Sequence, residues 1–166
     1  MADTKSKADR SRNMAAIKGK DTKPEMIVRK YLFSKGLHFR VHVKKLAGSP
    51  DIVLSKFKTV IFVNGCFWHG HEGCKYFSLP KSNVEFWKGK IERNIERDRE
   101  SMHALLDLGW KVICVWECEL RNKQTRDETL NNIYNSIALA ESTGYNFQET
   151  DIPMAAEQEA GYSRLS

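Results

Sequence analysis

The chain has 166 residues, of which 41% are hydrophobic and 29% are charged. This composition is typical of one globular domain with its own core, and it excludes collagen-like, coiled-coil and wholly disordered proteins. No apolar run approaches the roughly 18 residues that a membrane-spanning helix needs, and the polar start MADTKSKADRSR does not resemble a secretory signal. We therefore expect a cytoplasmic protein.

The formal net charge of +6 is distributed unevenly. Residues 1–50 hold 13 Lys and Arg against 4 Asp and Glu, whereas the residues from 126 onward hold 2 against 7. A basic N-terminal third is expected where one end of a chain contacts phosphates, although a solvated lysine-rich leader has the same composition. We expect three segments: a basic segment (1–22), a folded domain (23–144) and a polar, acidic, disordered tail (145–166).

The first part of the chain predicts helices followed by a strand. A short basic helix is expected over residues 10–20. The sequence Thr22-Lys23-Pro24-Glu25 fits a capping box with proline in the first turn, so a second helix begins here and runs to Gly36. Alternation of apolar and polar residues predicts a half-buried strand over 37–43.

Two apolar runs predict a β-hairpin. Residues 51–54 and 59–63 are joined by a turn at Lys56-Phe57-Lys58. With Phe57 at the centre of the turn, Asp51 lies opposite Val63.

The second half predicts a long helix, a strand and a last helix. The long helix runs from an Asn83 cap to Gly109, and its core stripe is Val84, Ile91, Ile95, Met102, Leu105 and Leu106. A second stripe on this helix is Trp87, Lys90, Asn94 and Asp98. A strand over 110–118 and a helix from a Thr125 capping box to Gly144 complete the chain, with Leu130, Ile133 and Ile137 facing inward. This order predicts an α/β fold with a central mixed β-sheet flanked by helices.

A loop rich in cysteine and histidine follows the hairpin. Residues 66–74 (CFWHGHEGC) hold four candidate ligands, and Cys118 ends a later strand. Thiolate and imidazole ligands are typical of a tetrahedral structural zinc site, and cytoplasmic cysteines rarely form disulfides. With Cys114 included there are more candidates than a tetrahedron takes, so at least one has another role. Cys114 lies mid-strand among Val and Trp, which favours a buried thiol.

Pro50-Asp51 opens a strand, as in nucleases that hold a divalent cation with a carboxylate at a strand end. The pair alone is common in turns, and the Glu-x-Lys usual on the next strand is missing. Together with GCFWH at 65–69 the pattern is more specific: the chain resembles the very short patch repair (Vsr) endonucleases, a bacterial family that nicks DNA beside a thymine mispaired with guanine. The resemblance covers residues 9–123, through DRSRNMAAI, DTKPE, GSPDIV, VIFVNGCFWH, EFWKGKIERNIERDRE, LGWKV and WECELR.

The resemblance implies a restriction-endonuclease-like core with structural zinc and catalytic magnesium. The implied zinc ligands are Cys66, His71, Cys74 and Cys118. Asp51 is implied as the direct magnesium ligand, with the Val63 backbone carbonyl beside it, while Glu25 and Asp98 orient the ion's water shell. Glu25 is also explained as a cap residue, and Asp98 as a member of a surface ion pair.

The resemblance further makes His69 the general base that takes a proton from the attacking water. Histidine suits this role because it exchanges protons near neutral pH. Asn64 stands where some members carry histidine, and Val63 where they carry threonine. Asn64 can donate a hydrogen bond to a phosphate oxygen but cannot carry a proton.

Three aromatic residues, Phe67, Trp68 and Trp87, match the wedge that the family inserts into the base stack beside the mispair. The alternative is that the three rings pack on one another around the loop. Two further residues of the long helix, Lys90 and Asn94, match positions that contact the mispaired bases, with Met14 approaching from the other groove. The basic segment (1–22) would then close over the duplex.

We therefore expect a monomeric, magnesium-dependent endonuclease, associated with the nucleoid, that nicks duplex DNA 5′ to the thymine of a T·G mismatch. A cytosine-5 DNA methyltransferase is an implied functional partner, because deamination of 5-methylcytosine produces this mispair, and mismatch-repair proteins are others. The alternatives are a related nuclease with another mismatch or sequence preference, and a zinc-stapled DNA-binding module without hydrolysis.

Overall fold

The computed structural model describes residues 6–17 and 19–143, so the expected tail (145–166) lies outside the described residues. The elements follow in the order α1 (Lys7–Ala15), α2 (Lys23–Ser34), β1 (Ile52–Leu54), η1 (Ser55–Phe57), β2 (Thr59–Asn64), α3 (Val84–Asp107), β3 (Lys111–Trp116), η2 (Glu117–Leu120) and α4 (Lys123–Thr143), where η marks a short 3-10 helix. In this described part, no helix combines the length and apolar composition that crossing a bilayer requires.

The sheet has the strand order β1-β2-β3. β1 and β2 are antiparallel, whereas β2 and β3 run parallel, with Thr59 opposite Lys111 and Asn64 opposite Trp116. Parallel neighbours need a long crossover, and the connection through α3 provides it. The predicted α/β class and mixed sheet are confirmed, while the three described strands do not by themselves identify a restriction-endonuclease-like core.

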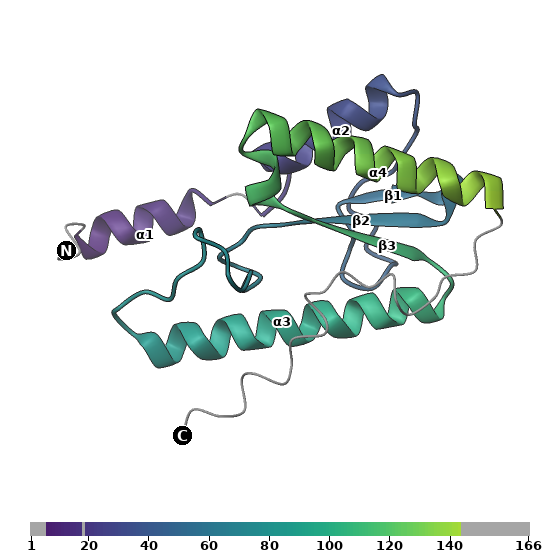
Figure 1. Ribbon diagram of the computed structural model, residues 1–166. Helices are drawn as coiled ribbons and strands as arrows, with labels where there is room; N and C mark the ends of the chain where they lie inside the picture. Colours follow the sequence, from purple (N-terminus) through teal and green to yellow (C-terminus); the bar gives the residue numbers. More distant parts are fainter. Residues whose placement is uncertain (1–5, 18, 144–166) are drawn as a thin grey trace.

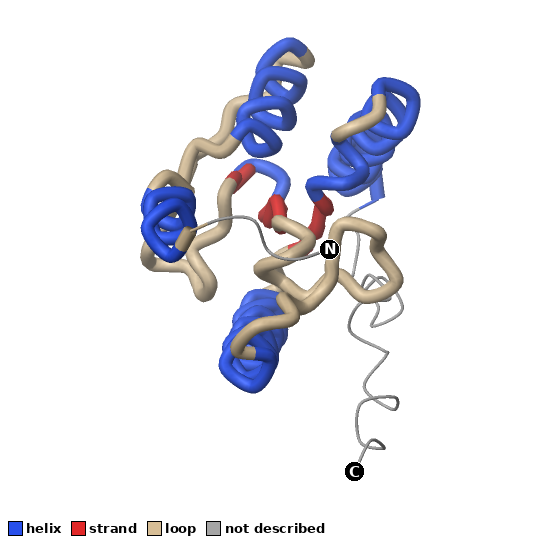
Figure 2. Tube along the Cα trace, turned by 90° about the vertical axis from the view of Figure 1, so that its left-hand side faces the viewer, coloured by secondary structure: helices blue, strands red, loops and turns tan. Residues whose placement is uncertain are grey.

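Helices cover both faces of the sheet (Figures 1 and 2): α2 and α4 lie on one face and α3 on the other. The core under α2 and α4 contains Val28, Leu32, Ile52, Leu54, Ile61, Val63, Val115, Leu120, Leu130, Ile133 and Ile137. The core under α3 contains Val53, Val60, Leu105 and Val112. Successive strand residues alternate between the two cores because their side chains point to opposite faces.

Helix α2 begins as predicted. The Thr22 hydroxyl oxygen accepts the Glu25 N–H at 3.4 Å, and Pro24 occupies the first turn. Gly36 follows the helix with φ 76, a conformation that glycine adopts without steric cost. The predicted inward residues of α4, namely Leu130, Ile133 and Ile137, are buried.

The β1–β2 register differs from the prediction by one residue, since the observed pairs place Phe62, and not Val63, opposite Asp51. The connection takes four residues (55–58), and therefore its centre lies between two residues and not on one. Lys58 ends this connection at φ 49, in the left-handed region.

The predicted strand over 37–43 is wrong: a single bridge forms there, between Arg40 and Val53. His42 adopts φ 48, which interrupts the extended backbone directly after the bridge. The apolar alternation in residues 37–43 therefore indicated that one side of this segment is buried, and not that it forms a strand. Leu37 and Phe39 pack against the core without joining the sheet.

Helix boundaries differ from the prediction in two places. The first helix spans Lys7–Ala15 and not residues 10–20. The last begins at Lys123 and not at Thr125, because the Asn122 side chain accepts the Gln124 N–H at 2.9 Å and so acts ahead of the predicted cap.

Part of the predicted core stripe of α3 is exposed. Ile91 and Leu105 are buried, but Val84 is 42% and Ile95 39% exposed. The N-terminal half of α3 extends past the end of the sheet in Figure 1, so the sheet does not cover these residues. Asn83 precedes the helix as predicted, although its side chain makes no capping bond.

The α2–α4 core predicts a large stability difference between two adjacent residues of α2. Leu32 is fully buried and Phe33 is 70% exposed. We expect Leu32→Ala to lower the free energy of unfolding by about 2–5 kcal/mol because it leaves a cavity. Phe33→Ala should change it by about 0.5 kcal/mol or less. Urea denaturation of both variants measures the difference, and equal losses would contradict the assigned helix orientation.

Candidate active site and metal centre

An open cleft of about 570 Å³ lies along the C-terminal half of β2. Its lining includes all five residues for which the sequence predicts catalytic roles: Glu25, Asp51, Asn64, His69 and Asp98. They come from α2, the start of β1, the end of β2, the following loop and α3. The fold thus gathers residues that are far apart in the sequence at one surface hollow.

Asp51 stands directly before β1, where its carboxylate is held by the backbone of β2. The Val63 N–H donates a hydrogen bond to Asp51 Oδ2 at 2.7 Å. Burial raises the pKa of the Asp51 carboxyl, the Val63 N–H opposes this shift and the nearby Glu25 carboxylate adds to it. The observed contact is with the Val63 N–H, whereas the family resemblance implied a role for the Val63 carbonyl.

Glu25 is 3% exposed, and protein donors occupy both of its oxygens. The Thr22 hydroxyl donates to Oε1 at 2.9 Å, and the Asp21 N–H donates to Oε2 at 3.0 Å. Arg29 Nη2 also donates to Oε2, at 2.7 Å. The Thr22 cap is confirmed, but Glu25 accepts the Asp21 N–H and the Thr22 hydroxyl where a capping box would have it accept the Thr22 N–H, and its charge is balanced by Arg29.

Arg29, His42 and Asp21 surround Glu25 and were not among the predicted site residues. Arg29 Nη2 lies 3.0 Å from His42 Nε2, and His42 Nδ1 lies 4.0 Å from Asp51 Oδ1. The spacing of Glu25 and Arg29, four residues apart on a helix, is a signal that could have indicated this ion pair. His42 offered no such signal, because it appeared as one polar residue of a predicted strand.

His69 and Asp98 form a hydrogen-bonded pair across the cleft, between His69 Nδ1 and Asp98 Oδ2. An ionised carboxylate can only accept, so Nδ1 carries the hydrogen and the other ring nitrogen, Nε2, is left as an acceptor. Arg97 also lies near Asp98, at 3.9 Å. The sequence analysis did not anticipate the contact with His69, since it placed Asp98 in the water shell of a metal or in a surface ion pair.

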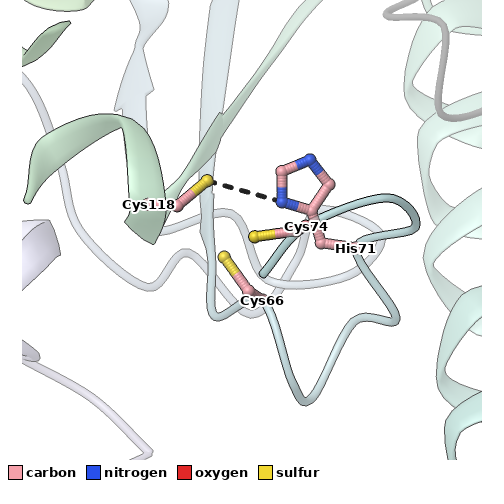
Figure 3. A group of neighbouring side chains, drawn as sticks. All are labelled: Cys66, His71, Cys74 and Cys118. Carbon is pink, nitrogen blue, oxygen red and sulfur yellow. Dashed lines mark hydrogen bonds between the residues drawn. The ribbon is translucent and has the colours of Figure 1, made fainter. Parts of the chain in front are cut away.

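Four side chains could hold a metal ion: Cys66, His71, Cys74 and Cys118. Their donor atoms lie within 4.8 Å of one another. Figure 3 shows three of them on the loop after β2 and the fourth on η2, with Cys118 Sγ 3.5 Å from Nδ1 of the histidine. This is the ligand set that the family resemblance implied.

The surroundings of the cluster favour metal binding by His71. Its ring stacks on Trp116, with centroids 4.0 Å apart and an angle of 4°. Burial lowers the pKa of His71, which favours the neutral imidazole that a metal requires. Burial acts in the opposite direction on Cys66, where it raises the pKa to about 12 and so disfavours the thiolate that a metal requires.

The two other candidates lie outside this cluster. His69 contacts Asp98, as described above, and Cys114 Sγ lies 3.5 Å from Met102 Sδ. Burial of the sulfur raises the pKa of Cys114 to about 12, but the residue is half-buried and lines the cleft, so the prediction of a buried thiol is only partly right.

An aromatic cluster lies beside the cleft and contributes Trp68 to its lining. The Phe67 ring lies 5.1 Å from Trp68 and 5.5 Å from Trp87, measured between centroids. Lys90 Nζ lies 5.4 Å from the Trp68 centroid, and Asn94 Nδ2 donates to the Trp68 carbonyl at 2.9 Å. The rings pack on one another and remain partly exposed. The side chain of Met14 lies outside the described part of the chain.

Gly70 lets the cysteine- and histidine-rich loop (66–74) approach α3 closely. It has φ 61, and a Cβ built on it would lie 2.9 Å from Ile91 Cγ2 and 2.7 Å from Ile95 Cδ1. Because Gly70 follows His69 directly, this contact helps to hold that histidine against Asp98.

Comparisons with known proteins agree with these features. Residues 2–75 match the family model for DNA mismatch endonuclease Vsr. The chain is 49% identical over 137 residues to the type II nicking enzyme V.NmeAIP of Neisseria meningitidis, covering 82% of this chain and 97% of the relative. It is 47% identical over 131 residues to DNA mismatch endonuclease Vsr of Escherichia coli K12, covering 78% and 83% respectively. With the type II nicking enzyme V.XorIIP of Xanthomonas oryzae it shares 45% identity over 133 residues, covering 80% and 97%.

The close approach at Gly70 predicts a steric penalty that a second loop glycine does not have. Gly73 has φ 69, similar to Gly70, but no atom lies within 4 Å of the position its Cβ would take. We expect Gly70→Ala to lower the free energy of unfolding by about 1–3 kcal/mol more than Gly73→Ala, because only Gly70 is crowded. Chemical denaturation of both variants measures this difference. Equal losses of unfolding free energy would mean that the cost comes from the positive φ and not from the contact with α3.

Proposed function

The chain belongs to the DNA mismatch endonuclease Vsr family, and we propose that it nicks duplex DNA 5′ to the thymine of a T·G mismatch in a magnesium-dependent reaction. One observation carries this proposal: Asp51 and the hydrogen-bonded pair His69–Asp98 line a single cleft, and Trp68, a member of a partly exposed aromatic cluster, lines it with them. A phosphodiester in this cleft would meet an oxygen ligand for a cation, an oriented base and a stacking surface together.

The residues of the cleft fit a magnesium ion. Magnesium takes one or two protein carboxylates and keeps several waters, and Asp51 offers one carboxylate in an open, hydrated hollow. We propose Asp51 and the Val63 carbonyl as its protein ligands. Both oxygens of Glu25 already accept protein hydrogen bonds, so Glu25 would act on the water shell through its charge. When bound, the ion stabilises the negative charge that develops on the phosphate and on the leaving oxygen.

In the proposed reaction, His69 Nε2 takes a proton from a water molecule as its oxygen bonds to phosphorus. The bond from phosphorus to the 3′ oxygen breaks, and that oxygen takes up a proton from solvent. Asp98 holds the His69 ring with Nε2 as the acceptor and stabilises the ring once it is protonated. Asn64 can donate a hydrogen bond to a phosphate oxygen, because it lines the same cleft.

The cysteine–histidine cluster fits zinc. Three thiolates and one imidazole form a common closed tetrahedral site, and all four donors here come from the protein. We propose that zinc binds here and fixes residues 66–74. Since Phe67, Trp68 and His69 belong to this segment, the ion would hold the stacking surface and the base in place.

Recognition of the mispair would rest on the aromatic cluster. We propose that Phe67, Trp68 and Trp87 enter the base stack, where unstacking costs less at a mismatch than at a paired step. Lys90, above the Trp68 ring, and Asn94 would then meet the edges of the mispaired bases. The basic segment (1–22), including Met14, would contact the other groove and the phosphates.

The proposed substrate also indicates when the enzyme acts. Deamination of 5-methylcytosine converts a G·C pair to a G·T mispair, so we propose a functional link to a cytosine-5 DNA methyltransferase and to mismatch-repair proteins. We propose that the enzyme works as a monomer, because the cleft and the metal cluster are each formed within one chain.

The test is a nicking assay with magnesium on duplexes that carry one T·G mismatch, another mismatch, or none. We expect Asp51→Ala and His69→Ala to lower the nicking rate by about 100-fold or more, because each loses a group that acts in the transition state. His103→Ala, an exposed histidine of α3, is the matched control and should cut at the wild-type rate.

DNA binding by the same variants, measured without divalent ions, separates loss of chemistry from loss of folding. Wild-type cleavage at the T·G duplex alone supports the proposed substrate. Cleavage of all three duplexes would replace it with a nuclease of another preference, and undiminished cutting by both variants would refute the catalytic assignment.

The metal cluster predicts a difference between two cysteines of the same region. Cys118→Ala should release zinc and lower the midpoint of thermal unfolding, because a closed zinc site contributes directly to folding. Cys114→Ala should keep about one zinc ion per chain, since the Cys114 thiol lies outside the cluster. Atomic absorption on purified proteins gives both values, and full zinc content in Cys118→Ala would remove Cys118 from the ligand set.

A further inference from the structure

Arg29 lies at the centre of a charged network beside Asp51. Its Nη1 donates to Asp21 Oδ1 at 2.5 Å, its Nη2 donates to Glu25 Oε2 at 2.7 Å, and the same Nη2 is 3.0 Å from His42 Nε2. The Arg29 side chain is 9% exposed. Contacts with two carboxylates and one imidazole therefore hold this buried guanidinium in one position.

The contact with Arg29 decides which nitrogen of His42 carries the proton. A guanidinium has five N–H donors and no acceptor, so His42 Nε2 must accept and therefore carries no hydrogen. The carboxylates of Asp21 and Glu25 are farther from Nε2, at 3.5 and 3.7 Å. A hydrogen on Nε2 would point at the nearer guanidinium donor. In this geometry the hydrogen of the His42 ring lies on Nδ1.

The protonated nitrogen of His42 faces the catalytic carboxylate. His42 Nδ1 lies 4.0 Å from Asp51 Oδ1, while Asp51 Oδ2 is already held by the Val63 N–H. His42 has φ 48, a left-handed conformation that is uncommon outside glycine and that surrounding contacts must hold in place. Such backbone strain is often found where a side chain has a functional orientation.

We propose that Arg29 and His42 are positioning residues for Asp51: Arg29 fixes the tautomer of His42, and the His42 Nδ1–H orients the Asp51 carboxylate for a divalent cation. This inference rests on the proposed function, in which Asp51 binds that cation. At 4.0 Å the ring acts through its N–H dipole, and such contacts often shorten when substrate binds. The Val63 N–H holds Oδ2 and the His42 ring faces Oδ1, so each oxygen of the carboxylate has one donor group beside it.

The tautomer can be observed directly. In nitrogen-15 NMR spectra of the full-length protein, without divalent ions or DNA at the cleft, a protonated ring nitrogen is well separated from a bare one. We expect Nδ1 of His42 to be the protonated nitrogen, and Arg29→Met to abolish that preference. The exposed residues His38 and His103 serve as internal references. A wild-type His42 with its proton on Nε2, or on both nitrogens, would overturn the proposal.

The effect on Asp51 is measured by titrating magnesium alone and following the Val63 amide resonance, because that N–H donates to Asp51. We expect His42→Ala to weaken magnesium binding by about 10-fold, as loss of a residue that supports a metal ligand commonly does. His42→Gln should regain most of this loss, since its amide can accept from Arg29 and donate toward Asp51. Both variants place a non-glycine residue at φ 48, so backbone strain is matched.

Unchanged magnesium affinity in His42→Ala, or equal loss in His42→Gln, would overturn the positioning role. Neither readout requires nicking activity. A wild-type protein that shows the Nδ1–H tautomer and binds magnesium at Asp51, yet does not cut mismatched DNA, would refute the proposed function and leave this inference standing.

Discussion

The parallel pairing of β2 with β3 determines where both functional features lie. The register puts Asn64 opposite Trp116, and Cys66 and Cys118 each follow two residues later, so the two strands leave the sheet side by side with one thiol each. The same end of β2 holds the Asp51 carboxylate through the Val63 N–H. One strand end therefore supports the metal cluster on one side and the cleft on the other, and a shift in this register would separate all of these groups.

His69 in the cleft and His42 beside Asp51 show how a neighbour decides what an imidazole can do. His69 turns Nδ1 to the Asp98 carboxylate, which leaves its Nε2 free to accept a proton. His42 turns Nε2 to the Arg29 guanidinium, which makes its Nδ1 a donor directed at Asp51. The ring is the same in both cases, and the charge of its partner, anionic or cationic, gives it the opposite role.

The features that were predicted correctly depend on residues close together in the chain. The Thr22–Glu25 cap and the buried stripe of α4 are set within one or a few helical turns. The predicted hairpin register was wrong because the register depends on the left-handed conformation of Lys58, and a lysine at this position does not indicate that conformation. Cysteine and histidine spacing alone left too many ligands for a tetrahedron. The mid-strand position of Cys114 argued against it, but only the family resemblance, and then the fold, removed His69 from the set. His42 was missed because its role comes from Arg29, thirteen residues earlier, across a bend that hydrophobic alternation does not reveal.

Within residues 66–74, the stacking rings and His69 lie between two donors of the metal cluster. Under the proposed function, damage that releases the ion, such as oxidation of a thiol, would displace the group that activates water together with the rings that sense a mispair. Loss of the ion would therefore remove water activation and mispair recognition together. A protein damaged in this loop would lose nicking activity altogether. It would not keep the ability to cut DNA after losing the ability to recognise a mispair.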